Sequence, residues 1–306
     1  MREAPWMLVT HHQGDPAKTE LGVLAGGSVR RAPAELSGLT MLELLERWDA
    51  LGPRLHGLDP AELDEVPGAV LVTPLRYPAA VLCAGANYHG HLAEMGSPRP
   101  EGPVRPYFFF KPPTTSVIGP DEPIVLPARD SRRIDWEIEL AAVIGTRCAD
   151  VAPERALDVV AGWTVVNDVS ARDQLVVQDS VSPAFRHDWV AAKAADTFCP
   201  LGPGVVPSWL VEDPQDLRLR LSVNGEVQQD SSTADMITPI TELIAQASRV
   251  VTLQPGDVVA TGTPAGVGVA RGKFLAPGDV VEAWIEGIGT LRNPVAGPAV
   301  TAGGGA

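Results

Sequence analysis

From residue 79 onward, the chain alternates between short β-prone runs and turns rich in proline and glycine. The runs are rich in valine, isoleucine and aromatic residues, which suit a pleated, half-buried surface. With 30 glycines and 29 prolines among 306 residues, many short elements are favoured over long helices. The pattern therefore predicts a β-rich α+β fold with a few short helices. The β-prone runs are 81–84, 107–110, 124–126, 136–144, 159–166, 217–223, 257–261 and 280–285.

Local signals predict one hairpin and two helices within this β-rich part. The dipeptide Asn224-Gly225 separates two β-prone runs, which is a strong signal for a two-residue hairpin turn. One helix is expected to begin after Asp168. The other is expected over about 239–249, with Thr238 as N-cap and a proline at the first helical position.

Residues 1–75 differ from the later part of the chain in sequence pattern, which predicts a small N-terminal domain. Thr40 and Glu43 form a capping-box pattern, in which each side chain satisfies a free backbone donor at a helix start. Apolar residues at helical spacing follow, which indicates a core-facing stripe. We expect the main domain over 76–296, and a disordered glycine- and alanine-rich tail over 297–306.

Composition narrows the class of partner. The formal net charge of −14 disfavours nucleic acid or an anionic membrane as the main partner. No apolar run approaches the ~20 residues that span a bilayer, and no signal peptide is apparent. The three cysteines are scattered, which fits neither a disulfide framework nor a zinc site. A cytoplasmic location is expected.

Residues 135–140, with the sequence DWEIEL, alternate acidic and apolar side chains. The strand period of two puts Asp135, Glu137 and Glu139 on one face. Carboxylates at this spacing repel one another and resist burial unless a cation neutralises them. Hard divalent cations prefer such oxygen ligands. The alternative is an exposed strand face with solvated acids.

Asp168 follows the buried-looking run 159–166, where a side chain is well placed to enter a site. Its alternative role is helix capping, although Ser170 and Asp173 already offer a capping pattern. Arg172 could bind a substrate carboxylate through two hydrogen bonds, or pair with a nearby aspartate on the surface.

Other polar residues are candidates for acid–base chemistry or substrate binding. His91 and Glu94 are three residues apart, so in a short helix the carboxylate can orient the ring and raise its basicity. Lys193 stands among apolar residues and could stabilise an oxyanion. Thr263 and Lys111 could contact substrate. The alternatives are a surface His–Glu pair, a snorkelling lysine and a plain turn.

Taken together, these segments resemble the fumarylacetoacetate hydrolase family, over about residues 79–295. The matching stretches occur in the family's order, which makes the combination specific although each one is short. They are 85–88 followed by His91 and Glu94, then 109–112, 135–140, 167–173, 196–203 and 256–264.

The resemblance implies a mixed β-sheet roll with a small N-terminal domain, and a homodimer. It implies Mg²⁺ or Mn²⁺ held by Glu137, Glu139 and Asp168. The remaining roles that it implies are a His91–Glu94 pair on a lid that orders when substrate binds, an active-site lysine at Lys193, and substrate contacts from Arg172 and Thr263, with Lys111 as a further candidate.

The implied substrate is a small 2-oxo acid. We expect hydrolysis of a carbon–carbon bond in an acylpyruvate-type 2,4-dioxo acid, through an enolate that the cation stabilises. The same enolate serves a decarboxylase or a tautomerase or isomerase, so these are the alternatives. A non-catalytic protein of the same fold would be expected to lack a metal carboxylate or His91, and this chain has them all.

Overall fold

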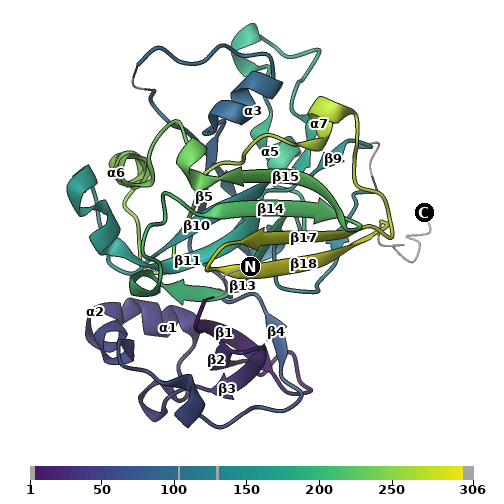
Figure 1. The fold of residues 1–306 in the computed structure, drawn as a ribbon. Helices are drawn as coiled ribbons and strands as arrows, with labels where there is room; N and C mark the ends of the chain where they lie inside the picture. The colour runs from purple at the N-terminus through teal and green to yellow at the C-terminus, as the bar shows by residue number, and fades with distance from the viewer. Residues whose placement is uncertain (1–3, 103, 129–130, 299–306) are drawn as a thin grey trace.

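The protein is described by a computed structural model over residues 4–102, 104–128 and 131–298 (Figure 1). The predicted β-rich α+β fold is confirmed: strands form two large sheets, and the helices are short. Within the described residues, no helix has both the length and the apolar character needed to cross a membrane.

The larger sheet has eleven strands and carries the site region. Its main path runs β3-β2-β1-β13-β11-β10-β16-β5-β6, while β4 pairs with β1 and β7 pairs with β13. The strands are β1 (Met7–His12), β2 (Glu20–Ala25), β3 (Ser28–Arg31), β4 (Val70–Val72), β5 (Val81–Gly85), β6 (Tyr107–Lys111), β7 (Val117–Ile118), β10 (Ile138–Ile144), β11 (Val160–Asn167), β13 (Cys199–Pro207) and β16 (Val258–Ala260).

A second sheet of five strands packs beside the first, in the order β15-β14-β17-β18-β8. The predicted hairpin joins β14 to β15, and Asn224 and Gly225 have φ of 53° and 79°. Positive φ at both central residues is typical of a type I′ turn, whose twist matches that of the two paired strands. The strands are β8 (Ile124–Val125), β14 (Arg218–Val223), β15 (Glu226–Ser232), β17 (Val280–Ile285) and β18 (Gly289–Ala296).

The N-terminal unit is continuous with the rest of the fold. Strand β1 pairs with β13, so four N-terminal strands, β1 to β4, extend the large sheet. The predicted capping box is confirmed at α1 (Met41–Glu46), where Glu43 N donates to Thr40 Oγ1 over 3.2 Å. Helix α1 places Leu44 and Leu45, and helix α2 (Trp48–Leu51) places Trp48, in one apolar cluster with residues of β5, β10 and β16.

Of the two expected helices, one is confirmed and one is wrong. Helix α6 spans Ile240–Val250, one residue later than expected. After Asp168 the chain instead continues in the short strand β12 (Ser170–Ala171), which pairs with β9 (Ile134–Asp135). A single 3-10 turn over Arg172–Gln174 follows. The capping pattern fails because Asp173 accepts from Ser131 Oγ and Arg132 N. Of the expected tail, 299–306 lie outside the described residues.

Candidate metal centre and acid–base pair

Two adjacent strands bring three carboxylates together. Glu137 directly precedes β10, Glu139 lies within it, and Asp168 follows β11, its antiparallel neighbour. The backbone N–H of Asp168 donates to the carbonyl of Glu137 over 2.8 Å, which fixes the two chain segments side by side. All three side chains are buried, with at most 4% of each residue exposed. The sequence therefore buries three acids at one point of the sheet.

The geometry of these carboxylates fits a divalent cation. One oxygen from each of Glu137, Glu139 and Asp168 lies within 4.8 Å of the other two. Oxygen ligands at about 2.0–2.6 Å from one ion are separated by at most roughly this distance. Among the residues that the structure describes, no lysine or arginine forms an ion pair with Glu139. The donor set thus has the charge and spacing that Mg²⁺ or Mn²⁺ requires.

Two buried lysines approach Asp168 from different sides. Lys193 lies on α5 (Trp189–Lys193), and its Nζ is 2.6 Å from Glu137 Oε2 and 2.7 Å from Asp168 Oδ2. Lys111 ends β6, and its Nζ donates to Asp168 Oδ1 over 2.5 Å and to the Val169 carbonyl over 3.0 Å. Because its contacts are protein oxygens, the position of Lys111 suits a support for Asp168 better than a substrate contact.

Asp135 does not join the carboxylate group, contrary to the strand-period prediction. The strand is interrupted between β9 and β10, so the side chain of Asp135 turns to other partners. It accepts hydrogen bonds from Gly268 N (2.6 Å), Val269 N (3.0 Å) and Arg172 Nε (2.8 Å). The Arg172 guanidinium also reaches Glu137 Oε1 over 2.5 Å. Asp135 therefore orients Arg172 toward the centre.

The electrostatics of the two glutamates are opposite. Burial opposes ionisation of Glu137, but the charges of Lys193 and Arg172 outweigh it and hold the pKa of this carboxyl below its usual range. Burial also raises the pKa of Glu139, and the neighbouring charges of Asp168 and Glu137 raise it further, well above its usual range. Of the three carboxylates, Glu139 is therefore the one whose negative charge the lysines and arginines of the protein compensate least.

The His91–Glu94 pair lies on α3 (His89–Glu94). His91 Nδ1 is 2.7 Å from Glu94 Oε1, and the other carboxylate oxygen accepts from Gly266 N over 2.8 Å. His91 lies near enough to Glu137 for its charge to lower the pKa of that carboxyl. The structure thus brings the predicted pair to the carboxylate centre, with Glu94 held by a segment far along the chain.

The segment 261–266 crosses the site beside β10. Gly262 N donates to Glu139 Oε2 over 2.7 Å, and Thr263 Oγ1 donates to the Ile138 carbonyl over 2.9 Å. The same hydroxyl accepts from Gln229 Nε2 over 2.9 Å. Thr263 is 3% exposed and already has these protein partners, so its role as a substrate contact stays a prediction. Gln229 was not among the sequence candidates, because no local pattern connects it to this segment.

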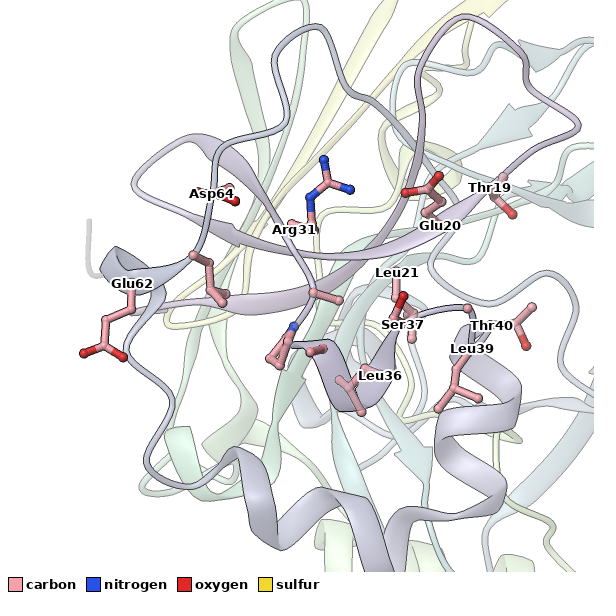
Figure 2. Close-up of a pocket in the computed structure, with 15 residues that line it drawn as sticks. Thr19, Glu20, Leu21, Arg31, Leu36, Ser37, Leu39, Thr40, Glu62 and Asp64 are labelled. Carbon is pink, nitrogen blue, oxygen red and sulfur yellow. The ribbon is translucent and has the colours of Figure 1, made fainter.

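A cavity in the N-terminal unit lies away from all these residues. It measures about 600 Å³ and is lined by residues of the segments 19–21, 31–40 and 62–64, most of them exposed or partly exposed. Figure 2 shows Arg31 at this cavity between Glu20 and Asp64. None of the predicted site residues contributes to its lining.

Comparison with known proteins places most of the chain in one family. The family described as "Fumarylacetoacetate (FAA) hydrolase C-terminal" matches residues 80–296. The chain is 42% identical over 227 residues to a Xenopus laevis protein named oxaloacetate tautomerase fahd2, mitochondrial. That match covers 74% of this chain and 68% of the relative.

Solved structures agree along nearly the whole length. A 2-hydroxyhepta-2,4-diene-1,7-dioate isomerase from Mycobacterium marinum is 34% identical with a TM-score of 0.72, over 96% of this chain and 99% of that one. A maleylpyruvate hydrolase from Sphingobium sp. SYK-6, in complex with manganese(II) and pyruvate, is 32% identical with a TM-score of 0.72, over 95% and 99% of the two chains.

Proposed function

The chain belongs to the fumarylacetoacetate hydrolase family, and from this premise we propose that it is a divalent-metal-dependent enzyme that interconverts the keto and enol forms of a short 2-oxo acid. The observation that carries the proposal is the part-buried His91–Glu94 pair beside the three carboxylates. This arrangement supplies one proton-transfer group and one cation site, which are the two elements that enolisation needs.

His91 is the residue proposed to move the proton. The Glu94 carboxylate accepts a hydrogen bond from His91 Nδ1, so the ring hydrogen sits on Nδ1. The lone pair of Nε2 is then free to take a proton from a carbon of the substrate. Glu94 is itself fixed by Gly266 N, which limits rotation of the pair. In the direction of enolisation, His91 takes a proton from the carbon next to the keto group and delivers it to the oxygen that becomes the enol hydroxyl. Ketonisation moves the proton from that hydroxyl back to the carbon.

The metal ion and the positively charged side chains beside it have complementary roles. A bound Mg²⁺ or Mn²⁺ would supply Lewis acidity at a keto oxygen, with Glu137, Glu139 and Asp168 as its ligands. Lys193 is proposed to donate to an oxygen on which negative charge develops, and Arg172 to bind a substrate carboxylate. Lys193 and Arg172 each form an ion pair with Glu137, so both side chains lie next to the carboxylate centre.

Hydrolysis of a 2,4-dioxo acid is the second candidate, and the sequence alone favours it. The similar maleylpyruvate hydrolase structure contains manganese(II) and pyruvate, and pyruvate is a 2-oxo acid. Hydrolysis needs a water beside His91 in addition to the groups above. We rank it second because two relatives named as oxaloacetate tautomerases are 42% and 40% identical to this chain, while the maleylpyruvate hydrolase is 32% identical.

Product analysis separates the two reactions. The purified protein would be incubated with Mn²⁺ or Mg²⁺ and, separately, with oxaloacetate enol and acetylpyruvate. We expect faster ketonisation of the oxaloacetate enol, lost with EDTA, and loss of roughly a hundredfold or more of the rate in His91→Asn. Release of acetate and pyruvate from acetylpyruvate, with no effect on the oxaloacetate enol, would replace this proposal with the hydrolase.

A further inference from the structure

Gln229 connects the second sheet to the site. It lies on β15 and is fully buried, with 0% of the residue exposed. Its Oε1 accepts from Ile138 N over 3.0 Å, and its Nε2 donates to Thr263 Oγ1 over 2.9 Å and to the Pro264 carbonyl over 2.8 Å. One side chain thereby joins β10, at the residue between Glu137 and Glu139, to the segment that follows β16.

That same segment holds Glu94. Two residues after Pro264, the N–H of Gly266 donates to Glu94 Oε2, and its carbonyl accepts from Trp136 Nε1 over 3.1 Å. Gly266 has φ of +106°, and an added Cβ would lie 2.1 Å from the Gln228 carbonyl oxygen. The segment is therefore packed directly on β15 and has little freedom to move independently of it.

We propose that Gln229 is a positioning residue that sets the His91–Glu94 pair relative to the carboxylate strand. The connection runs from Ile138 through Gln229 to the segment 263–266, and from there through Gly266 to Glu94. Gln229 touches neither Glu94 nor the three carboxylates through these bonds, so it acts through other groups. This inference rests on the proposed function, since it assigns His91 the proton transfer.

Gln229 suits this task because an amide offers both an acceptor and two donors. Losing them would leave Ile138 N and the Pro264 carbonyl unpaired inside the protein. The strand β10 would still be held by β11 and β16 on both sides. The segment 263–266 would lose two of its bonds and shift, so the acid–base pair should be affected more than the metal site.

The test compares two neighbouring glutamines. Gln229→Met keeps the size and removes all three hydrogen bonds, while Gln228→Met is the matched control. Gln228 is also buried, at 4% exposed, but among the described residues its Nε2 donates only to the Glu226 carbonyl of its own strand. We expect Gln229→Met to lower kcat by roughly tenfold to a hundredfold. The KM and the Mn²⁺ affinity should each change by less than about threefold. The control should match the wild type.

Amide hydrogen exchange tests the inference without relying on turnover. In Gln229→Met, exchange should accelerate roughly tenfold in 263–266 and in α3, and stay unchanged in β10 and β11. Gln229→Glu keeps the acceptor for Ile138 N, so it serves as the second variant if Gln229→Met does not fold. Faster exchange in these segments would support the inference even if neither proposed substrate reacts.

A double mutant distinguishes positioning from simple stabilisation. If Gln229 acts through Glu94, then Gln229→Met should lower kcat much less in a Glu94→Gln background than in the wild type. The proposal is overturned if the two effects on kcat multiply. It is also overturned if Gln229→Met only lowers the melting temperature, with kcat and exchange in 263–266 and α3 as in the wild type.

Discussion

At the residue scale, the three buried carboxylates are compensated unequally. Glu137 and Asp168 have lysine or arginine partners within 2.7 Å, while Glu139 has a hydrogen bond from Gly262 N. Burial and the charges of the other two acids raise the pKa of Glu139. Without a cation, an ionised Glu139 is therefore destabilising, which is typical of a residue retained for binding rather than for stability.

Replacing Glu139 should separate stability from metal binding. In EDTA, Glu139→Gln should raise the free energy of unfolding, because it removes the like-charge repulsion. In the same variant, Mn²⁺ affinity should fall by roughly a hundredfold. Chemical denaturation and calorimetric titration measure the two effects, with the exposed Glu46→Gln as control. A variant that is less stable in EDTA but binds Mn²⁺ normally would contradict this account.

Lys111 should matter for stability. Lys111→Met would leave the buried Asp168 with one fewer cation and should lower the free energy of unfolding by about 3–5 kcal/mol. Lys18→Met is the matched control, because Lys18 pairs with Asp15 on an exposed surface. Urea unfolding measures both. A cost for Lys111→Met no larger than that for Lys18→Met would show that the buried pair is not formed.

The residues most visible in the sequence are those whose local pattern carries the signal. Glu137 and Glu139 follow the strand period, and His91 and Glu94 follow the helical one, so their proximity could be predicted. Gln229 and Lys111 could not be placed from local pattern, because their partners lie 91 and 57 residues away in the chain. Gln229 reaches its partners because the second sheet packs on the first, and Lys111 reaches Asp168 because non-consecutive strands share the large sheet.

At the scale of elements, prolines and a strand break limited the prediction. Strand β13 was missed because its sequence, CPLGPGVVP, resembles a turn, although all nine of its residues are buried. The break between β9 and β10 turned Asp135 away from the other acids, where strict alternation had placed it with them. In both cases tertiary pairing overrides the local pattern.

Strand β1 carries a histidine that should make stability depend on pH. His11 is 1% exposed, and neither ring nitrogen has a partner among the described atoms. Burial lowers the pKa of His11, and the charge of Glu20 opposes this only in part, while His12 and Arg31 lower it further. The folded state therefore favours neutral His11. Its contribution is present above the unfolded pKa of about 6.5 and is lost as the pH falls from there through the lower pKa of the folded state.

His11→Phe should reduce this dependence. Between pH 7.5 and 5.5, the wild type should lose stability at a rate of up to about 1.4 kcal/mol per pH unit from this group, and the variant should lose less. Urea unfolding at several pH values measures the slopes. His56→Phe, at an exposed site of the same unit, is the control. Equal slopes in the wild type and His11→Phe would refute the assignment.

At the scale of the whole molecule, the N-terminal unit and the remainder share one sheet and one apolar cluster. A chain that lacks residues 1–75 would expose β13 and the apolar face under α1 and α2. We expect it to aggregate or to lose cooperative unfolding, which circular dichroism on heating would measure. A stable fragment with the melting temperature of the full chain would instead support an independent domain boundary near residue 75. The homodimer stays a prediction that sedimentation equilibrium would check.

The central claim is that one divalent cation binds where Glu137, Glu139 and Asp168 meet. The most direct measurement is anomalous X-ray diffraction from crystals of the protein grown with Mn²⁺. We expect one strong manganese peak within coordination distance, about 2.0–2.6 Å, of an oxygen from each of the three carboxylates. A manganese peak at other residues, or no peak at this centre at saturating Mn²⁺, would contradict it.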